Sequence, residues 1–195
     1  MEWKIACSEC NALILIDTAI KNKGLCIPCA KGYRKQIEES QKYYAEDKKY
    51  RDSEEYAYWL NLSNKVSSQD DLKKLIFEEQ VYFVINILIG EVFNGGFDQY
   101  FFNSSGDYYG ETILALKELN AFKSLELLEN AKVELFGSVD VPSDRLLRFD
   151  ILNSKENVGS NELDKLDKIF WELPDQLDQK LQQYVQLKNL FKLYE

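Results

Sequence analysis

The sequence predicts an all-α helical bundle domain preceded by a small cysteine-based module. All four cysteines of the chain lie within its first 29 residues, in two Cys-X2-Cys pairs. The rest of the chain carries apolar residues at helical spacing, which is typical of helices that pack on one another. Only 9 Gly and 3 Pro occur in 195 residues, which is few for a β-sandwich with many turns. The length suits one domain with a small appendage.

The cysteine pairs read Cys7-Ser-Glu-Cys10 and Cys26-Ile-Pro-Cys29, and fifteen residues separate them. Each pair can form a turn whose two thiolates point at one ion, and two such turns supply the four tetrahedral ligands of a closed zinc site. Two disulfides, four free thiols or a redox Cys-X2-Cys motif are less favoured alternatives, because neither a secretion signal nor a βαβ pattern is visible. We therefore expect one structural Zn²⁺ ion held by Cys7, Cys10, Cys26 and Cys29.

The residues around the cysteines predict a zinc-binding module of ribbon or treble-clef-like type over residues 1–35. Leu13 to Ile16 can form a short strand, and Asn22-Lys23-Gly24 marks a turn. Residues 30–39 look helical, which places the second cysteine pair at a helix N-terminus, where the helix dipole favours thiolates.

Residues 36–52 are predicted to be a helical connector, and residues 53–195 an acidic all-α domain. We expect one long central helix that opens at Ser68 and ends at a Gly95-Gly96 cap, because glycine supplies the left-handed conformation at helix ends. Residues 153–160 are expected to form a loop. Further helices are expected over residues 54–67, 107–120, 121–136, 161–173 and 175–193.

The formal net charge of −9 is unevenly distributed along the chain. Residues 1–35 hold 6 Lys/Arg and 3 Asp/Glu, a balance of +3, whereas residues 36–195 hold 18 Lys/Arg and 30 Asp/Glu, a balance of −12. An acidic body of this kind repels nucleic acid, so we expect no direct nucleic-acid binding and a basic protein as partner.

The segment Asn94-Gly-Gly-Phe-Asp-Gln-Tyr-Phe-Phe-Asn-Ser-Ser-Gly106, with the C-terminal stretch from Leu163 to Phe191, resembles a bacterial domain-of-unknown-function family typified by an acidic DNA-mimic protein. The resemblance covers roughly residues 50–195 and leaves the cysteine module outside. It implies an all-α, often dimeric protein, so a homodimer is one expected assembly. It also implies that carboxylates occupy the DNA-binding face of a regulator, with an immunity or antitoxin role against a toxin as the rival interpretation.

Rows of acidic residues at helical spacing are candidates for such a partner-binding surface, because residues three or four apart share one helix face. The same rows also suit ordinary solvated helix faces. The candidate partner-binding residues are Asp98, Asp107, Glu111, Glu118, Glu126 and Glu129.

An enzymatic function is not indicated by the residues of the chain. No His is present, and no phosphate-binding glycine loop or nucleophile elbow occurs. The aromatic residues of 97–102 are expected to pack a core. The interpretation is thus a non-enzymatic interaction protein, and a nucleic-acid-associated factor led by the basic zinc module is the alternative from another class.

The longest apolar stretch, Leu72 to Phe93, contains five charged residues and is expected to be a buried core helix, with no membrane partner. The N-terminus lacks the pattern of a signal peptide, so a cytoplasmic location is expected.

Overall fold

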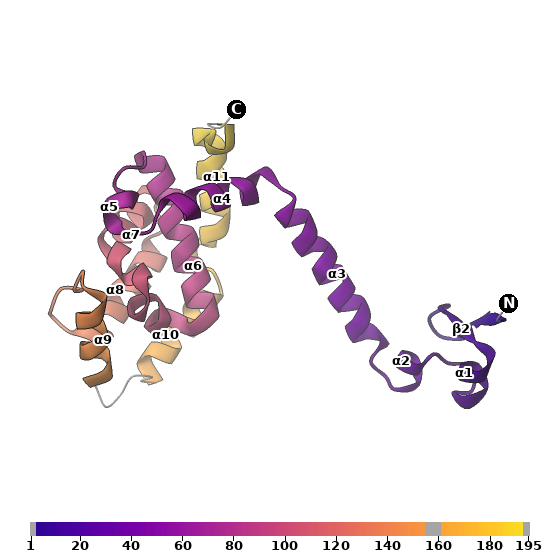
Figure 1. The fold of residues 1–195 in the computed structure, drawn as a ribbon. Helices are drawn as coiled ribbons and strands as arrows, with labels where there is room; N and C mark the ends of the chain where they lie inside the picture. The colour runs from indigo at the N-terminus through magenta and orange to yellow at the C-terminus, as the bar shows by residue number, and fades with distance from the viewer. Residues whose placement is uncertain (1–2, 155–160, 193–195) are drawn as a thin grey trace. The chain divides into compact units, whose positions relative to one another are not determined.

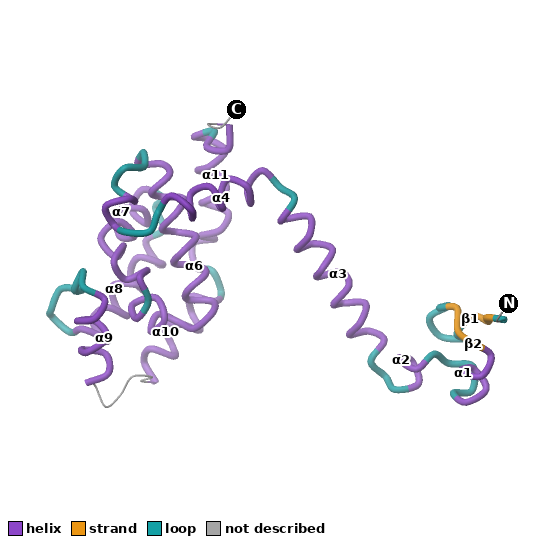
Figure 2. Tube along the Cα trace, viewed as in Figure 1, coloured by secondary structure: helices purple, strands orange, loops and turns teal. Residues whose placement is uncertain are grey.

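The fold is described from a computed structural model, for residues 3–154 and 161–192. The chain divides into two compact units, Met1–Tyr56 and Ala57–Glu195 (Figure 1). In the described residues, every regular element is a helix except one pair of short strands (Figure 2). This arrangement confirms the predicted all-α class with a small cysteine module in front.

The N-terminal unit begins with a two-stranded antiparallel sheet of β1 (Lys4–Ala6) and β2 (Leu13–Leu15), in which Ile5 lies opposite Ile14. The strand expected at Leu13 is therefore present. Three helices follow, and a break at Gly32, with φ of +75°, separates the second from the third. The sequence predicted one continuous helix over residues 30–39, and that prediction is wrong because of this break. The helices are α1 (Ile16–Lys21), α2 (Ile27–Ala30) and α3 (Arg34–Arg51).

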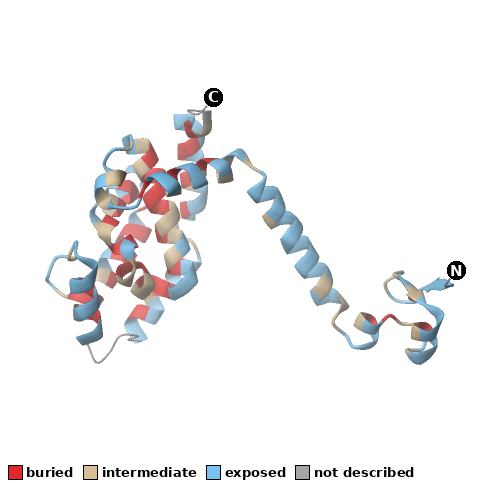
Figure 3. Ribbon diagram, in the orientation of Figure 1, coloured by how far each residue is buried: buried red, intermediate tan, exposed pale blue. Residues whose placement is uncertain are grey.

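Helix α3 has no buried residue along its 18 residues (Figure 3). Ion pairs at i,i+4 spacing decorate its surface, namely Lys35–Glu39, Lys42–Glu46 and Asp47–Arg51. Each such pair stabilises an isolated helix by about 0.2–0.5 kcal/mol. Helix α3 is therefore a solvated helix, as its charged composition predicts.

The second unit is a helical bundle built around one long helix, α6, which is contacted by α7, α9, α10 and α11. Residues 153–154 close helix α9, and the remainder of the predicted loop, residues 155–160, lies outside the described residues. The elements are α4 (Glu54–Lys65), α5 (Gln69–Leu72), α6 (Phe77–Phe102), η1 (Ser104–Tyr108), α7 (Tyr109–Glu118), α8 (Phe122–Phe136), α9 (Arg145–Ser154), α10 (Asn161–Trp171), η2 (Pro174–Gln176), α11 (Leu177–Lys188) and η3 (Leu190–Lys192).

The central helix differs from the prediction at its N-terminal end. Ser68 caps only the short helix α5, because its hydroxyl accepts the Asp71 N–H at 3.2 Å, and α6 begins separately at Phe77. At the other end, Gly95 and Gly96 have non-helical backbone angles and end the first helical stretch of α6, as predicted, and a second stretch follows across the kink to Phe102.

The kink is held by two side chains of α10. Gly96 has φ of +79° and ψ of −178°, a conformation that only glycine adopts readily. The carboxylate of Asp167 accepts the Phe97 N–H at 2.8 Å, and the Trp171 indole N–H donates to the Val92 carbonyl at 2.9 Å. These bonds satisfy backbone groups next to the interruption.

Substituting Gly96 by alanine is expected to destabilise the helical unit. A Cβ at this position would overlap the Asp167 carboxylate, and the backbone conformation adds strain of about 1–3 kcal/mol. Gly110→Ala is the matched control, because a Cβ there meets nothing within 4 Å and α7 favours alanine over glycine. Urea denaturation followed by circular dichroism measures both variants. A Gly96→Ala chain as stable as Gly110→Ala would contradict the account of the kink.

The aromatic residues after the kink form part of the core, as predicted: Phe97, Tyr100 and Phe101 are fully buried, and Phe102 is half-buried against them. By length and composition α6 could cross a membrane. However, half of its most apolar stretch is buried inside the protein, which is the pattern of a central core helix.

Candidate metal centre and acidic residues

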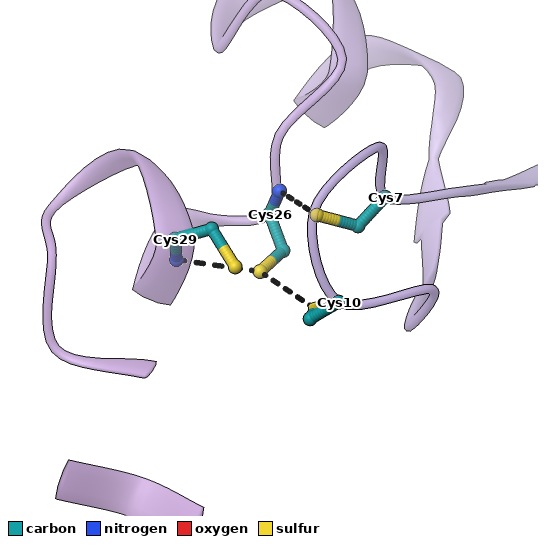
Figure 4. Close-up of side chains that lie close together, drawn as sticks. All are labelled: Cys7, Cys10, Cys26 and Cys29. Carbon is teal, nitrogen blue, oxygen red and sulfur yellow. Dashed lines mark hydrogen bonds between the residues drawn. The ribbon is translucent and has the colours of Figure 1, made fainter. Parts of the chain in front are cut away.

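The four cysteine thiols converge at one point in the N-terminal unit. Figure 4 shows Cys7 and Cys10 approaching from the loop after β1, and Cys26 and Cys29 from the start of α2. Their four sulfur atoms lie within 4.8 Å of one another. The Sγ atoms of Cys10 and Cys26 are 3.7 Å apart, far longer than the roughly 2.05 Å of a disulfide. None of the four cysteines forms a disulfide, so the arrangement is a cluster of four free thiols.

Local backbone geometry positions the cluster. The Cys7 N–H donates to the Ala12 carbonyl at 2.9 Å, which closes the loop that carries the first pair. Cys26 is the N-cap of α2, with its sulfur accepting the Cys29 N–H at 3.4 Å, and Pro28 lies in the first turn, where a missing N–H costs nothing. The second pair therefore lies at a helix N-terminus, as expected, but the helix is the short α2 and not the one predicted over residues 30–39.

Hydrogen bonds to sulfur favour the thiolate form of two of the cysteines. Backbone N–H groups, that of Cys10 first and that of Cys26 next, lower the pKa of Cys7 to about 6. The Arg34 guanidinium donates to the Cys26 sulfur at 3.1 Å and lowers the pKa of that thiol. Burial acts in the opposite direction on Cys29 and raises its pKa to about 12.

Arg34 is the cation that the structure places on the cluster. The sequence offers several cations near the cysteines, and their spacing alone does not distinguish one from another. Arg34 begins α3, five residues after Cys29, and its pKa is raised because its guanidinium bonds to the Cys26 and Cys29 sulfurs. Its position just beyond a turn that follows the last cysteine is the signal that could have identified it.

The six candidate partner-binding residues do not form one surface of equivalent side chains. Glu118, at the end of α7, and Glu126 and Glu129, on α8, are exposed, and Glu126 pairs with Lys123 at 2.8 Å. The other three are half-buried and are held or enclosed within the unit.

Asp107 and Glu111 make internal contacts. Asp107 forms an ion pair with Arg148, and Glu111 accepts the Gln69 amide at 2.9 Å. Asp98 lies in the first turn after the kink, where one of its carboxylate oxygens is buried without a hydrogen-bond partner among the described residues, and burial raises its pKa. Asp167 also has a raised pKa, mainly through burial and further through the nearby carboxylates of Asp164 and Asp98.

Arg148 organises the segment around Asp107, and sequence patterns gave no indication of this role. Its side chain is completely buried, and its guanidinium donates to the carbonyls of Phe101 and Asn103, each at 2.9 Å. Gly106 leaves room for it, because a Cβ at residue 106 would lie 2.7 Å from the Arg148 Nε. The arginine thus fixes the path of the chain from the end of α6 through η1.

A comparison with protein families gives a match to the DMP19-like proteins over residues 73–188, more than half of the chain. The chain belongs to the DMP19-like protein family. Searches of curated proteins and of solved structures found no match. The DMP19-like region contains the Asn94–Gly106 segment, the α6 kink and the Arg148 contacts, and the cysteine cluster lies outside it.

Proposed function

We propose that this DMP19-like protein is a non-enzymatic interaction protein whose acidic helical unit binds a basic protein, and that its four cysteines hold one structural zinc ion. A DNA-binding regulator, recognised because carboxylates imitate DNA phosphates, is the partner that we favour. An immunity or antitoxin role would use the same charge complementarity with a toxin.

The division of charge between the two units carries the proposal. Residues 1–56 contain 10 Lys/Arg and 10 Asp/Glu and are neutral, whereas residues 57–195 contain 14 Lys/Arg and 23 Asp/Glu, so the helical unit carries the whole net charge of −9. A field of this sign attracts basic proteins and accelerates their association. The balance of +3 over residues 1–35 is cancelled by −3 over residues 36–56, and this weak field argues against a nucleic-acid-associated factor led by the zinc module.

The cysteine cluster fits zinc in its donor set and its dimensions. A tetrahedral site with Zn–S bonds of about 2.3 Å has sulfur atoms roughly 3.8 Å apart, close to the 3.7 Å between Cys10 and Cys26. Four sulfur ligands leave no position for water, so the ion would be structural. Because a metal ligand must be a thiolate, binding would displace the proton that burial holds on Cys29.

The basic partner is first isolated by affinity capture from native cytoplasm at low salt. Its association with this protein is expected to slow by roughly tenfold or more as salt rises from about 0.05 M to about 0.5 M, since salt screens the field of the helical unit. Replacing Glu118, Glu126 and Glu129 together by glutamine removes three exposed negative charges and should slow association at low salt. The matched control replaces Glu38, Glu39 and Glu46 of α3, which are also exposed, by glutamine. Stopped-flow or surface-binding kinetics measure both effects.

Three results would contradict or refine this proposal. Recovery of no basic protein from native cytoplasm at low salt argues against any basic partner. Equal slowing by the two triple variants argues against the helical unit as the binding surface. Duplex DNA should displace a regulator bound by mimicry, whereas a toxin held by an immunity protein should remain bound.

A further inference from the structure

A small cavity of about 280 Å³ opens in the helical unit between α4, α6 and η1. Its apolar wall consists of Val66, Phe83 and Ile87, and the ring of Tyr108 stands edge-on to Phe83 with centroids 5.8 Å apart. This volume lies at the lower end of ligand pockets, so it suits a single side chain better than a nucleotide-sized cofactor.

The polar lining of the cavity contains hydroxyl groups and one carboxylate, that of Glu91. The hydroxyl of Ser63 is buried and has no hydrogen-bond partner among the described residues. Ser104 and Ser105 line the side formed by η1. No Lys or Arg is among the lining residues, so no cation of the cavity wall neutralises the carboxylate.

Glu91 is held in place by two amides of the Asn94–Gly106 segment. Its Oε2 atom accepts the Gln99 amide at 2.6 Å and the Asn103 amide at 2.9 Å. Neutral donors orient a carboxylate without cancelling its charge. The other oxygen, Oε1, accepts no hydrogen bond in the described part of the chain and is available to a ligand.

Further carboxylates lie near the cavity at Tyr108. Burial raises the pKa of the Tyr108 hydroxyl, and the charges of Asp107, Asp71 and Glu111 raise it further. Asp107 and Asp71 have cationic partners of their own, whereas Glu111 is bonded to the neutral amide of Gln69. The local potential therefore favours a cation in the cavity.

We propose that this cavity receives one lysine or arginine side chain of the basic protein partner, with Glu91 as its counter-ion. The aliphatic stem would pack against Phe83, Ile87 and Tyr108, and the cationic head would donate to Glu91 Oε1 and to the Ser63 hydroxyl. This inference rests on the proposed function and makes it more specific, because a diffuse acidic surface gains one defined contact with a positively charged residue.

The test titrates the full chain, labelled with ¹⁵N, with four probes while backbone amide signals are followed by NMR. The probes are n-butylamine, n-butanol as its neutral counterpart, and lysine and arginine blocked at both backbone ends. The three cationic probes are expected to bind with dissociation constants on the order of millimolar and to shift the amide signals of Ser67, Ser104, Ser105 and Tyr108. Butanol should leave those signals unchanged.

Two variants and one control locate the contact. Glu91→Gln keeps an oxygen for the Gln99 and Asn103 amides but removes the charge. It should raise the dissociation constants of the cationic probes by about tenfold or more. Ser67→Trp places a bulky ring at the exposed rim of the cavity and should block all three cationic probes. Glu172→Gln removes an exposed charge just after α10, away from the cavity lining, and should leave probe binding unchanged.

Three results would overturn the inference. The first is the absence of saturable shifts at the cavity, and the second is equal binding of butanol and butylamine. The third is that butylamine binds but blocked lysine and blocked arginine do not, which would assign the cavity to a free small amine. A basic partner that binds the Glu91→Gln and wild-type chains equally would also overturn it while leaving the proposed function intact. Failure to find any basic partner would instead refute the proposed function, and the probe titration is independent of that result.

Discussion

Chelation of the metal, or the Cys26→Ser substitution, is expected to unfold the N-terminal module and to leave the helical unit folded. Among residues 3–56, the buried side chains are those of Cys7, Ala19, Cys26 and Cys29, so the cysteine cluster is nearly the whole core of this unit. Large apolar side chains such as Trp3, Leu13 and Ile20 are exposed. Zinc binding at such sites contributes roughly 10–16 kcal/mol near neutral pH, which a core this small cannot replace.

Metal analysis and NMR of the reduced, freshly prepared protein provide the measurement. One equivalent of zinc is expected in the wild-type chain and much less in Cys26→Ser. Ser8→Ala is the matched control in the same loop, because Ser8 is exposed and its hydroxyl makes only a long bond of 3.4 Å to the Gly24 carbonyl. Less than half an equivalent of metal would contradict the zinc site. Iron in place of zinc would contradict the identity of the ion.

Circular dichroism of the chelated protein tests the independence of the two units. The helical unit has its own core of buried residues from α4 to η3, so most of the helix signal should persist. Loss of most of that signal on chelation would show instead that the two units fold as one cooperative structure.

The cysteine cluster could be predicted from sequence because its geometry is local. A spacing of two residues between cysteines places both thiols on one turn, and four thiolates in two such turns are typical ligands of a structural zinc ion. The class of the helical unit was predictable for a similar reason, since apolar spacing and few glycines are properties of the chain itself.

The path of α6 and the roles of the acidic residues could not be predicted, because they depend on partners far along the chain. Gly95-Gly96 indicates the end of a helix. The kink that joins it to the next helical stretch depends on Asp167 and Trp171, which lie more than 70 residues away in the sequence. From its sequence context Asp107 resembles a surface carboxylate. In the structure it pairs with Arg148, which lies 41 residues away. Charge spacing on a helix shows which residues share a face, but it does not show which face is covered.

Replacing Arg148 is expected to be the most damaging single change in the helical unit. Its guanidinium donates to four backbone carbonyls, including that of Pro142 at 2.7 Å, and pairs with Asp107. Arg148→Met would fill much of the space but leave these buried acceptors and a half-buried carboxylate without a donor. Breaking a buried pair in this way costs about 3–5 kcal/mol, and urea denaturation followed by circular dichroism measures the loss.

Related substitutions separate the effect of charge from that of geometry. Arg148→Lys keeps the charge but lacks the planar set of donors, so it should restore little of the stability. Asp107→Asn removes the charge of Asp107 but keeps an amide oxygen that can accept from the guanidinium, and it leaves the four carbonyl bonds, so it should cost less than Arg148→Met, about 1.5–3 kcal/mol. Arg145→Met is the matched control on α9, because Arg145 is exposed and makes one bond of 3.3 Å.

The order of these variants distinguishes a backbone clamp from a simple ion pair. If Arg148 acts mainly through its charge, Arg148→Lys should be nearly as stable as wild type, and Asp107→Asn should be as damaging as Arg148→Met. If it acts as a clamp on the end of α6 and on η1, both arginine replacements should be much less stable than Asp107→Asn. The four carbonyl bonds favour the second order. A loss below about 1 kcal/mol in Arg148→Met would refute both, because it would mean that water replaces the guanidinium at little cost.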